Sequence, residues 1–347
     1  MKIWTKTAAM ALLFALAAAA CTSEAEPAPD GSTTSGGGGG TVVIYSGREE
    51  EMVADLIAKM EADTGLDLDV RYGDSAELAA QILEEGPNSP ADVFWAQDAG
   101  SLGVVSGAGQ FAPLDQVVLD RVDPRFRSSD GTWVGVSGRG RVAIYNTDEL
   151  QASDLPDTVW GLTQSKWKGK LGIAPTNSSF QAFIAAMIER EGEERTREFL
   201  EKLKANDPKF YEDNGSTTRA VAAGEVLVGL VNHYYKYEVE AEDGPISAEN
   251  HFFKAGDPGA LINTAGVGVL TTAANPEGAA RIVDYLTGEP GQTWVAEDTW
   301  EYPLAPGYEP SVDLVPLDQV QGPDIDLSKL GDTLQPALVL LAETGYV

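Results

Sequence analysis

The sequence predicts an α/β fold of two lobes joined by a hinge. Residues 41–347 are longer than the roughly 250–300 residues that one hydrophobic core usually serves. Short β-branched runs alternate with apolar residues at helical spacing, which indicates right-handed βαβ crossovers. In this reading the chain forms one α/β lobe, then a second, and then returns to complete the first. We therefore expect two lobes, each a mostly parallel sheet flanked by helices, with a ligand cleft at the hinge.

Residues 1–20 have the composition of an export signal. Lys2 and Lys6 precede a short apolar core that ends in alanines and is too short to span a membrane. Cys21, the only cysteine of the chain, follows directly, and its position resembles the lipid-modified cysteine of bacterial lipoproteins. Residues 21–40 then form a tether rich in Gly, Ser, Pro and Glu. We predict an exported, membrane-anchored protein; simple secretion is the alternative.

The charge of the chain excludes several classes of partner. Its formal net charge is −30 at pH 7, with 54 acidic residues against 24 basic ones. Phosphate backbones and anionic membrane surfaces repel such a chain, so we expect no nucleic-acid partner. The acidic residues are spread along the sequence, which fits solvated helix faces better than a store of cations. We expect a monomer, without internal repeats.

The first lobe begins with strands and helices in alternation. Strands are predicted at 41–45, 66–72 and 92–95, and helices at 52–60 and 75–85. Gly65 ends the first of these helices. Because ligands bind at the carboxyl ends of parallel strands, the turn after Tyr45, Gln97 and Asp98 are expected to face the cleft.

The chain then passes to the second lobe and comes back. Strands at 132–136 and 141–145, joined by a turn at 137–140, lead out of the first lobe, and strands at 260–263 and 265–270 lead back. We place the first lobe at 41–135 plus 260–300 and the second at 136–259. Residues 301–347 are predicted to be a helical segment that packs on the lobes, with its closing helix at 330–344.

Small polar residues open helices at three strand-to-helix junctions of the second lobe. They are Asn177, Ser178 and Ser179 at the first junction, Asn214 at the second and Asn232 at the third. Ordinary helix capping accounts for one residue at each junction. Several such residues at one sheet edge also offer amides and hydroxyls to an anion.

Two adjacent tyrosines, Tyr234 and Tyr235, follow the apolar strand predicted at 226–231 and precede an amphipathic stretch. Neighbouring side chains of a strand point to opposite faces, so both phenols reach one ligand only if the strand ends before them. An aromatic pair that packs the corner is the alternative.

Paired phenols favour a highly charged cation. Phenol has a pKa near 10 and binds a metal at neutral pH only if the metal drives the proton off, which Fe(III) does and Ca(II) or Mg(II) mostly do not. Soft-metal sites are excluded, because the chain has one cysteine and two histidines, His233 and His251. We expect His233 to lie outside the site.

A series of short stretches resembles the ferric-ion-binding periplasmic proteins of bacterial ABC transporters. In chain order they are VIYSG at 43–47, ADVFW at 91–95, SGRGRV at 137–142, WKGKLG at 167–172, APT at 174–176, NHYY at 232–235, DPGAL at 257–261 and EYPL at 301–304. The resemblance covers nearly all of residues 41–347. It implies a periplasmic-binding-protein fold of type II and a solute-binding protein that delivers Fe(III) to a permease in the inner membrane.

The resemblance also implies a set of site residues. Tyr234 and Tyr235 become phenolate ligands of Fe(III), and a synergistic anion, phosphate or carbonate, is held by residues from several junctions: Arg139, Asn177, Ser178, Ser179, Asn214 and Asn232. Well-known members carry a histidine where this chain has Glu49 and a glutamate where it has Gln97. We expect Glu49 to be an oxygen ligand and Gln97 to hydrogen-bond a bound water or anion; Glu50 and Asp98 are possible substitutes.

Two other functions are open at this point. The same architecture serves proteins that bind polyamines, thiamine or phosphonates, and an acidic, aromatic cleft suits an organic cation. A secreted hydrolase would use Glu49 and Asp98 as paired carboxylates. The sequence contains no evident catalytic dyad or nucleophile constellation, so we predict a binding protein and not an enzyme.

Overall fold

The computed structural model describes residues 39–347. The predicted export signal, Cys21 and most of the predicted tether lie outside the described residues. Within 39–347, no helix is both long enough and apolar enough to cross a membrane.

The strands follow one another in the spatial order β2-β1-β3-β9-β4-β7-β5-β6, and β8 and β10 also pair with β4. Their bounds are β1 (Thr41–Ser46), β2 (Asp67–Tyr72), β3 (Val93–Ala96), β4 (Trp133–Asn146), β5 (Leu171–Ile173), β6 (Lys209–Phe210), β7 (Val228–Asn232), β8 (Ala248–His251), β9 (Ile262–Val269) and β10 (Tyr302–Pro303). The α-helices are α1 (Glu50–Thr64), α2 (Ser75–Glu85), α3 (Ala99–Gly107), α4 (Gln116–Leu119), α5 (Ser178–Glu191), α6 (Glu193–Ala205), α7 (Asn214–Ala222), α8 (Tyr235–Asp243), α9 (Pro276–Thr287), α10 (Glu289–Asp298) and α11 (Leu330–Glu343).

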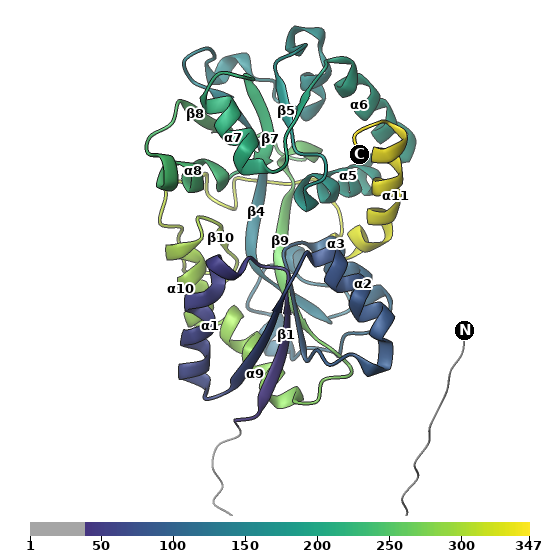
Figure 1. Cartoon of the computed structure of the whole chain (residues 1–347), viewed down its shortest axis with the longest axis vertical. Helices are drawn as coiled ribbons and strands as arrows, with labels where there is room; N and C mark the ends of the chain where they lie inside the picture. Colours follow the sequence, from purple (N-terminus) through teal and green to yellow (C-terminus); the bar gives the residue numbers. More distant parts are fainter. Residues whose placement is uncertain (1–38) are drawn as a thin grey trace, which may run out of the picture. The chain divides into compact units, whose positions relative to one another are not determined.

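Strand β4 belongs to both lobes (Figure 1). Its first half pairs with β9 and β10 as far as Gly140, and its second half pairs with β7 and β8 from Arg141 onward. The turn predicted at 137–140 is therefore wrong. Gly138 marks a close approach instead, since a Cβ added there would lie 3.1 Å from the side chain of Leu304.

Each sheet is mixed. The outer pairs β1–β2, β1–β3, β5–β6 and β5–β7 are parallel, as predicted. The pairs made by β4 and β9 are antiparallel, so the prediction of mostly parallel sheets is wrong for these central strands. The reason is that β9 brings the chain back from the second lobe and runs against β4.

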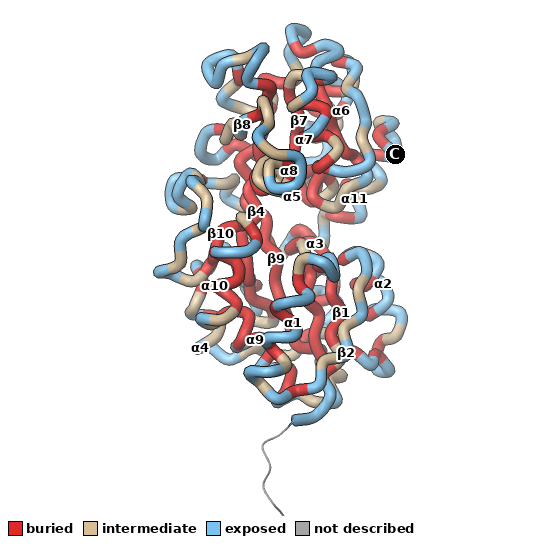
Figure 2. The backbone as a smooth tube through the Cα atoms, turned by 60° about the vertical axis from the view of Figure 1, so that its left-hand side comes forward, coloured by how far each residue is buried: buried red, intermediate tan, exposed pale blue. Residues whose placement is uncertain are grey.

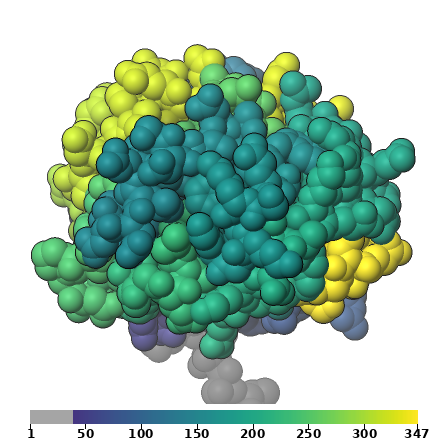
Figure 3. All heavy atoms as spheres, turned by 90° about the horizontal axis from the view of Figure 1, so that it is seen from above, coloured from purple at the N-terminus to yellow at the C-terminus, as the bar shows by residue number. Residues whose placement is uncertain are grey.

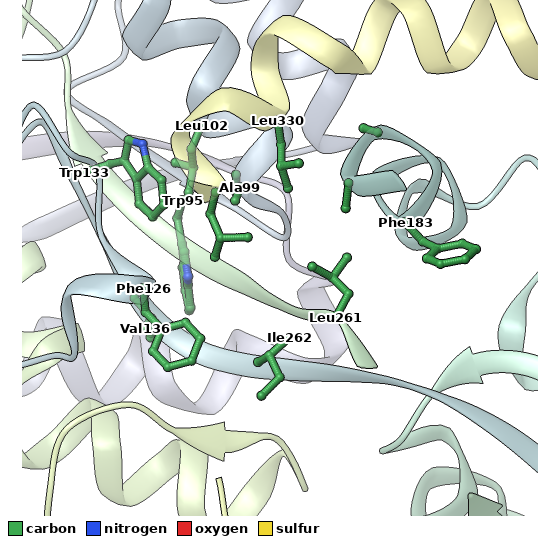
Figure 4. Packing of buried hydrophobic residues seen from close by; sticks show 14 of the residues in the cluster. Trp95, Ala99, Leu102, Phe126, Trp133, Val136, Phe183, Leu261, Ile262 and Leu330 are labelled. Carbon is green, nitrogen blue, oxygen red and sulfur yellow. The ribbon is translucent and has the colours of Figure 1, made fainter. Parts of the chain in front are cut away.

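Helices cover both sheets. In the first lobe, α1, α9 and α10 lie on one side and α2 and α3 on the other, and in the second lobe α7 and α8 lie opposite α5 and α6 (Figure 1). The buried residues follow β4 and β9 along the centre of residues 39–347 (Figure 2). One apolar cluster includes both Trp95 of the first lobe and Phe183 of the second, and Figure 4 shows Leu330 of α11 beside Leu102 of α3 in this cluster.

Helix α11 packs on α3 of the first lobe and on α5 of the second. At its first-lobe end the backbones nearly touch, because a Cβ added to Gly331 would lie 2.4 Å from the carbonyl carbon of Gly103. At its far end Tyr346 stacks on Phe210 with ring centroids 5.4 Å apart and donates to the carbonyl of Leu200. Figure 3 shows C-terminal residues on two sides of the second lobe.

The C-terminal segment is only partly helical. The closing helix predicted at 330–344 is present as α11, but residues 301–326 contain β10 and otherwise neither helix nor strand. Prolines at 303, 306, 310, 316 and 323 explain this difference, because proline lacks the N–H that a helix interior requires.

Candidate functional site

The two adjacent tyrosines lie at the junction between β7 and α8. Strand β7 ends at Asn232, and Tyr234 occupies the N-cap position of α8. The strand therefore ends before the pair, which is the condition for both phenols to reach one ligand. Their ring centroids are 4.4 Å apart, with 31° between the ring planes.

A small cavity lies against the tyrosines and takes its walls from both lobes. It is lined by Arg48, Glu49, Met52, Gln97, Tyr234, Tyr235, Glu238 and Glu301. Its volume is about 20 Å³, little more than one water molecule needs. The arrangement therefore suits a single ion with oxygen ligands and is too small for an organic solute.

Phenolate oxygens are essential to any metal site here. Among residues 39–347, no group of three or more His, Cys, Asp or Glu side chains is arranged to hold a metal ion. Burial, followed by the neighbouring Tyr234, raises the pKa of Tyr235 well above its usual value of 10.0, although Arg139 acts in the opposite direction. A metal must therefore displace the Tyr235 proton on binding.

Arg139 lies against the tyrosine pair and the first-lobe wall. Its Nη2 donates to the phenol oxygen of Tyr234 at 2.5 Å, and its Nη1 donates to the carbonyl of Gln97 at 2.6 Å. Its Nε lies 3.4 Å from the carboxylate of Glu301. These contacts fix the Tyr234 phenol oxygen against the guanidinium group.

Glu301 holds two buried arginines. Its carboxylate lies 3.1 Å from Nη2 of Arg48 and also accepts a hydrogen bond from Ser137. Burial by itself would raise the pKa of Glu301, but the charges of Arg48 and Arg139 outweigh burial and lower it. Glu301 thus stays ionised and fixes the position of Arg139, which in turn contacts Tyr234.

Three residues predicted to hold an anion are brought together in the second lobe. The Oδ1 of Asn177 accepts from the Oγ of Ser179 at 2.6 Å and from the Nδ2 of Asn214 at 3.0 Å. Asn214 is fully buried, and its Oδ1 has no hydrogen-bond partner. Ser178 opens α5 beside them, half-buried. The cluster therefore has capacity for a further polar ligand.

The helix cap at the second junction is not Asn214. Asp213 caps α7 and accepts from the backbone N–H of Ser216 at 2.6 Å. Asn214 is thereby free to turn inward to Asn177 and Ser179. At the first junction Asn177 does cap its helix, accepting from the N–H of Ser179 at 3.0 Å. Asn232 is buried at the end of β7, opposite Arg141 of β4.

Arg141 is a site residue that the sequence reasoning missed. Its Nη1 donates to the Oγ of Ser179 at 3.1 Å and its Nη2 to the carbonyl of Leu230 at 2.7 Å. It is buried, and burial lowers its pKa to about 9. Among the described residues no carboxylate lies within ion-pair distance of it. Its spacing from Arg139 was a usable signal, since residues two apart on a strand share a face.

Comparison with known proteins identifies the family of this chain. Residues 88–319 match the model of the family described as bacterial extracellular solute-binding protein. The chain belongs to this family. The Fe(3+)-binding periplasmic protein of Serratia marcescens is 33% identical over 306 residues, which cover 87% of this chain and 90% of that relative. Membership confirms the prediction of a binding protein and not an enzyme.

Solved structures with the same fold confirm the predicted architecture of two α/β lobes. Iron-bound HitA from Pseudomonas aeruginosa superposes with a TM-score of 0.82 at 32% identity, covering 88% of this chain and 99% of that one. A Trichodesmium protein in complex with iron and citrate superposes with a TM-score of 0.77 at 29% identity, covering 88% of this chain and 100% of that one.

In this member of the solute-binding family, Glu238 is a second residue that the sequence reasoning missed. It lies on α8, one helical turn beyond the tyrosines, and lines the same cavity. Burial, followed by the charge of Glu49, raises the pKa of Glu238 to about 7. The spacing from Tyr234 and Tyr235 was the available signal, since residues three and four apart share a helix face.

The first-lobe wall of this solute-binding protein presents Glu49 and Gln97. Glu49 is exposed at the N-cap position of α1, where its side chain makes no capping bond, and it lines the cavity. Gln97 is half-buried and also lines it. Asp98 is buried and accepts from the N–H and the Oγ of Ser101 at 2.8 and 2.9 Å. It caps α3 and does not line the cavity, so it forms no carboxylate pair with Glu49.

His233 is turned away from the cavity. Its Nδ1 accepts from the N–H of Gly140 at 3.1 Å, so in the neutral ring Nε2 carries the proton and donates to the carbonyl of Trp300 at 2.9 Å. Burial lowers the pKa of His233 to about 4, which keeps the ring neutral. Both nitrogens are occupied by the backbone, which leaves neither for a metal.

Proposed function

We propose that this protein captures Fe(III) between its two lobes and delivers it to the permease of an ABC importer. The observation that carries the proposal is the adjacent pair Tyr234 and Tyr235, which faces a cavity of about 20 Å³ with Glu49 on the opposite wall. Phenolate and carboxylate oxygens are hard ligands that suit Fe(III). The Serratia relative, named as an Fe(3+)-binding protein, supports the same cargo.

The size of the cavity argues against the alternative cargoes. Polyamines, thiamine and phosphonates each need a pocket of hundreds of cubic ångströms, the usual range for small-molecule sites. The cavity against the tyrosines, about 20 Å³, is an order of magnitude smaller. An inorganic ion fits this space, and the organic solutes do not.

A synergistic anion, phosphate or carbonate, is part of the proposal. Its support is the cluster of Asn177, Ser179 and Asn214, together with the Nε of the adjoining Arg141, a buried donor without a hydrogen-bond partner. Arg141 takes the place at this cluster that we expected for Arg139, because it donates to Ser179 and has no carboxylate of its own. In the Trichodesmium relative, citrate is present together with iron.

Closure of the lobes follows from ligands on both walls. Tyr234 and Tyr235 belong to the second lobe and Glu49 to the first, so Fe(III) contacts both walls only when the lobes are shut. A ligand shifts a conformational equilibrium by its differential affinity for the two states. In this proposal the closed, iron-loaded form is the one that the permease recognises.

The proposed location is outside the cytoplasm, at the membrane. Export through residues 1–20 and a lipid on Cys21 would leave residues 39–347 as a monomer on a tether, facing the periplasm or the cell surface. A single lipid chain binds a membrane only marginally, so stable anchoring requires more than one acyl chain on Cys21.

A ferric titration tests the cargo. Ferric citrate added to the purified protein should produce the visible charge-transfer band of an Fe(III) phenolate, and the Tyr234→Phe, Tyr235→Phe double variant should show no band and no retained iron. Tyr237→Phe is the matched control, because its hydroxyl donates to the carbonyl of Asp313, outside the cavity. Absence of a band from the unaltered protein, or a band that survives the double substitution, would refute the proposal.

A further inference from the structure

The acidic residues of α8 fall into two groups. Glu240 lies 3.4 Å from the amino group of Lys236, and Glu242 and Asp243 both pair with Arg219. Glu238 alone among the four has no basic side chain within ion-pair distance in the described part of the chain, and its carboxylate makes no hydrogen bond there. It is nevertheless half-buried, whereas Glu242 and Asp243 are exposed.

The packing of α8 fixes the direction of Glu238. Val239 is buried in the second lobe, and Lys236 reaches Glu249 of the neighbouring β8 at 3.5 Å. Tyr237 donates to the carbonyl of Asp313 at 3.2 Å on another side. These contacts hold the helix so that Glu238 joins Tyr234 and Tyr235 in lining the cavity, with Glu49 facing it across the cleft.

Without a cation this arrangement is unfavourable. A carboxylate that is partly withdrawn from water and lies beside a second carboxylate gains free energy only from a positive partner. Arg219, the basic residue whose charge reaches Glu238, already pairs with Glu242 and Asp243. Arg139 and Arg48 are bound to Glu301. These pairings leave the cargo as the available positive partner for an ionised Glu238.

We propose that Glu238 is a direct ligand of the bound Fe(III), so that Glu238 and Glu49 supply one carboxylate oxygen from each lobe. The proposal rests on the function proposed above. It explains how this chain completes an oxygen ligand set although Gln97, a neutral amide, stands on the first-lobe wall. It also gives α8 two kinds of ligand within one helical turn, so that a movement of the helix would displace phenolate and carboxylate together.

The test compares Glu238→Gln with Glu240→Gln, a change of the same kind on the same helix at a residue that already has a lysine partner. Each purified protein is loaded with ferric citrate, and iron retention is then measured against increasing free citrate. Glu238→Gln should keep the phenolate charge-transfer band but lose iron to citrate with an affinity at least about tenfold weaker, since even residues that only orient a ligand cost that much. Glu240→Gln should match the unaltered protein.

Melting temperatures separate a ligand from a structural residue. Iron-free Glu238→Gln should melt at a higher temperature than the iron-free unaltered protein, because the amide removes the repulsion from Glu49. The rise in melting temperature on adding iron should be smaller in Glu238→Gln. Equal iron retention in the variant and the unaltered protein, or a lower melting temperature of the iron-free variant, overturns the inference. No band in the unaltered protein instead overturns the proposed function.

Discussion

The polar cluster of the second lobe is hydrogen-bonded and largely buried, whereas the first-lobe side of the cavity presents Glu49 at an exposed position and Gln97 at a half-buried one. Asn177, Ser179, Asn214 and Arg141 bond to one another in the second lobe. Glu49 makes no capping bond. The second lobe therefore holds these groups in place in the absence of cargo, and in the proposed function the first lobe contributes Glu49 when the lobes close.

One chain of contacts connects the two walls. Glu301 binds Arg48 and lies close to Arg139, and Arg139 donates to the phenol of Tyr234 in the second lobe. The tyrosine is thereby positioned from the first-lobe side through buried charges. If the two lobes differ as described, changes to this connection should have the largest effect on stability, and changes to the exposed Glu49 should have the smallest.

Glu301→Gln should cause the largest loss. It leaves Arg48 and Arg139 buried without a carboxylate, and breaking a buried ion pair in this way costs about 3–5 kcal/mol. Urea unfolding at neutral pH measures the change. Glu240→Gln is the control, because its pair with Lys236 is more exposed and such pairs contribute about 0–1 kcal/mol.

The pH dependence of this loss has a definite sign. Because the folded-state pKa of Glu301 is lowered from 4.5, its contribution is fully present above that pH and disappears as the pH falls through the folded value. The difference in unfolding free energy between the unaltered protein and Glu301→Gln should therefore narrow in acid. A difference that stays constant from neutral pH to acid would contradict the assigned charge.

Asn214→Ala should have an intermediate effect on stability and should weaken iron binding as well. Its amide donates to both Asn177 and Ser179 inside the second lobe, so its removal leaves buried polar atoms unpaired, at a cost of about 2 kcal/mol. Urea unfolding of the iron-free protein measures the first effect and citrate competition the second. An unchanged unfolding free energy would mean that the second-lobe wall is not organised in advance.

Glu49→Gln should leave stability nearly unchanged, within about 0.5 kcal/mol, because the side chain is exposed and makes no capping bond. Its iron affinity should nevertheless fall about tenfold, which corresponds to roughly 1.4 kcal/mol. Urea unfolding and citrate competition again measure the two effects. Glu51→Gln is the control, because Glu51 lies on the same first turn of α1 but does not line the cavity. Iron affinity equal to that of the unaltered protein would remove Glu49 from the ligand set.

Much of the fold follows from local pattern. The helix predicted at 75–85 has the observed bounds, because its apolar spacing and end signals lie within the segment itself. The turn predicted at 137–140 failed because two glycines resemble turn residues in sequence. In the structure Gly138 and Gly140 lie in β4 opposite Thr264 and Ile262 of β9, more than a hundred residues later in the chain.

The sequence by itself determined the tyrosine pair and the polar residues that open α5, since their chemistry is a property of the residues and of their position at a strand-to-helix junction. Only the tertiary structure determines which partner each of the two arginines contacts. It also brings Glu238 to face Glu49. Arg139 and Arg141 are equivalent in sequence. Their partners, Glu301 and Ser179, come from segments that are distant in sequence and contact the first-lobe and second-lobe halves of β4, respectively. The charge balance of the site therefore depends on packing between the lobes, which no local pattern encodes.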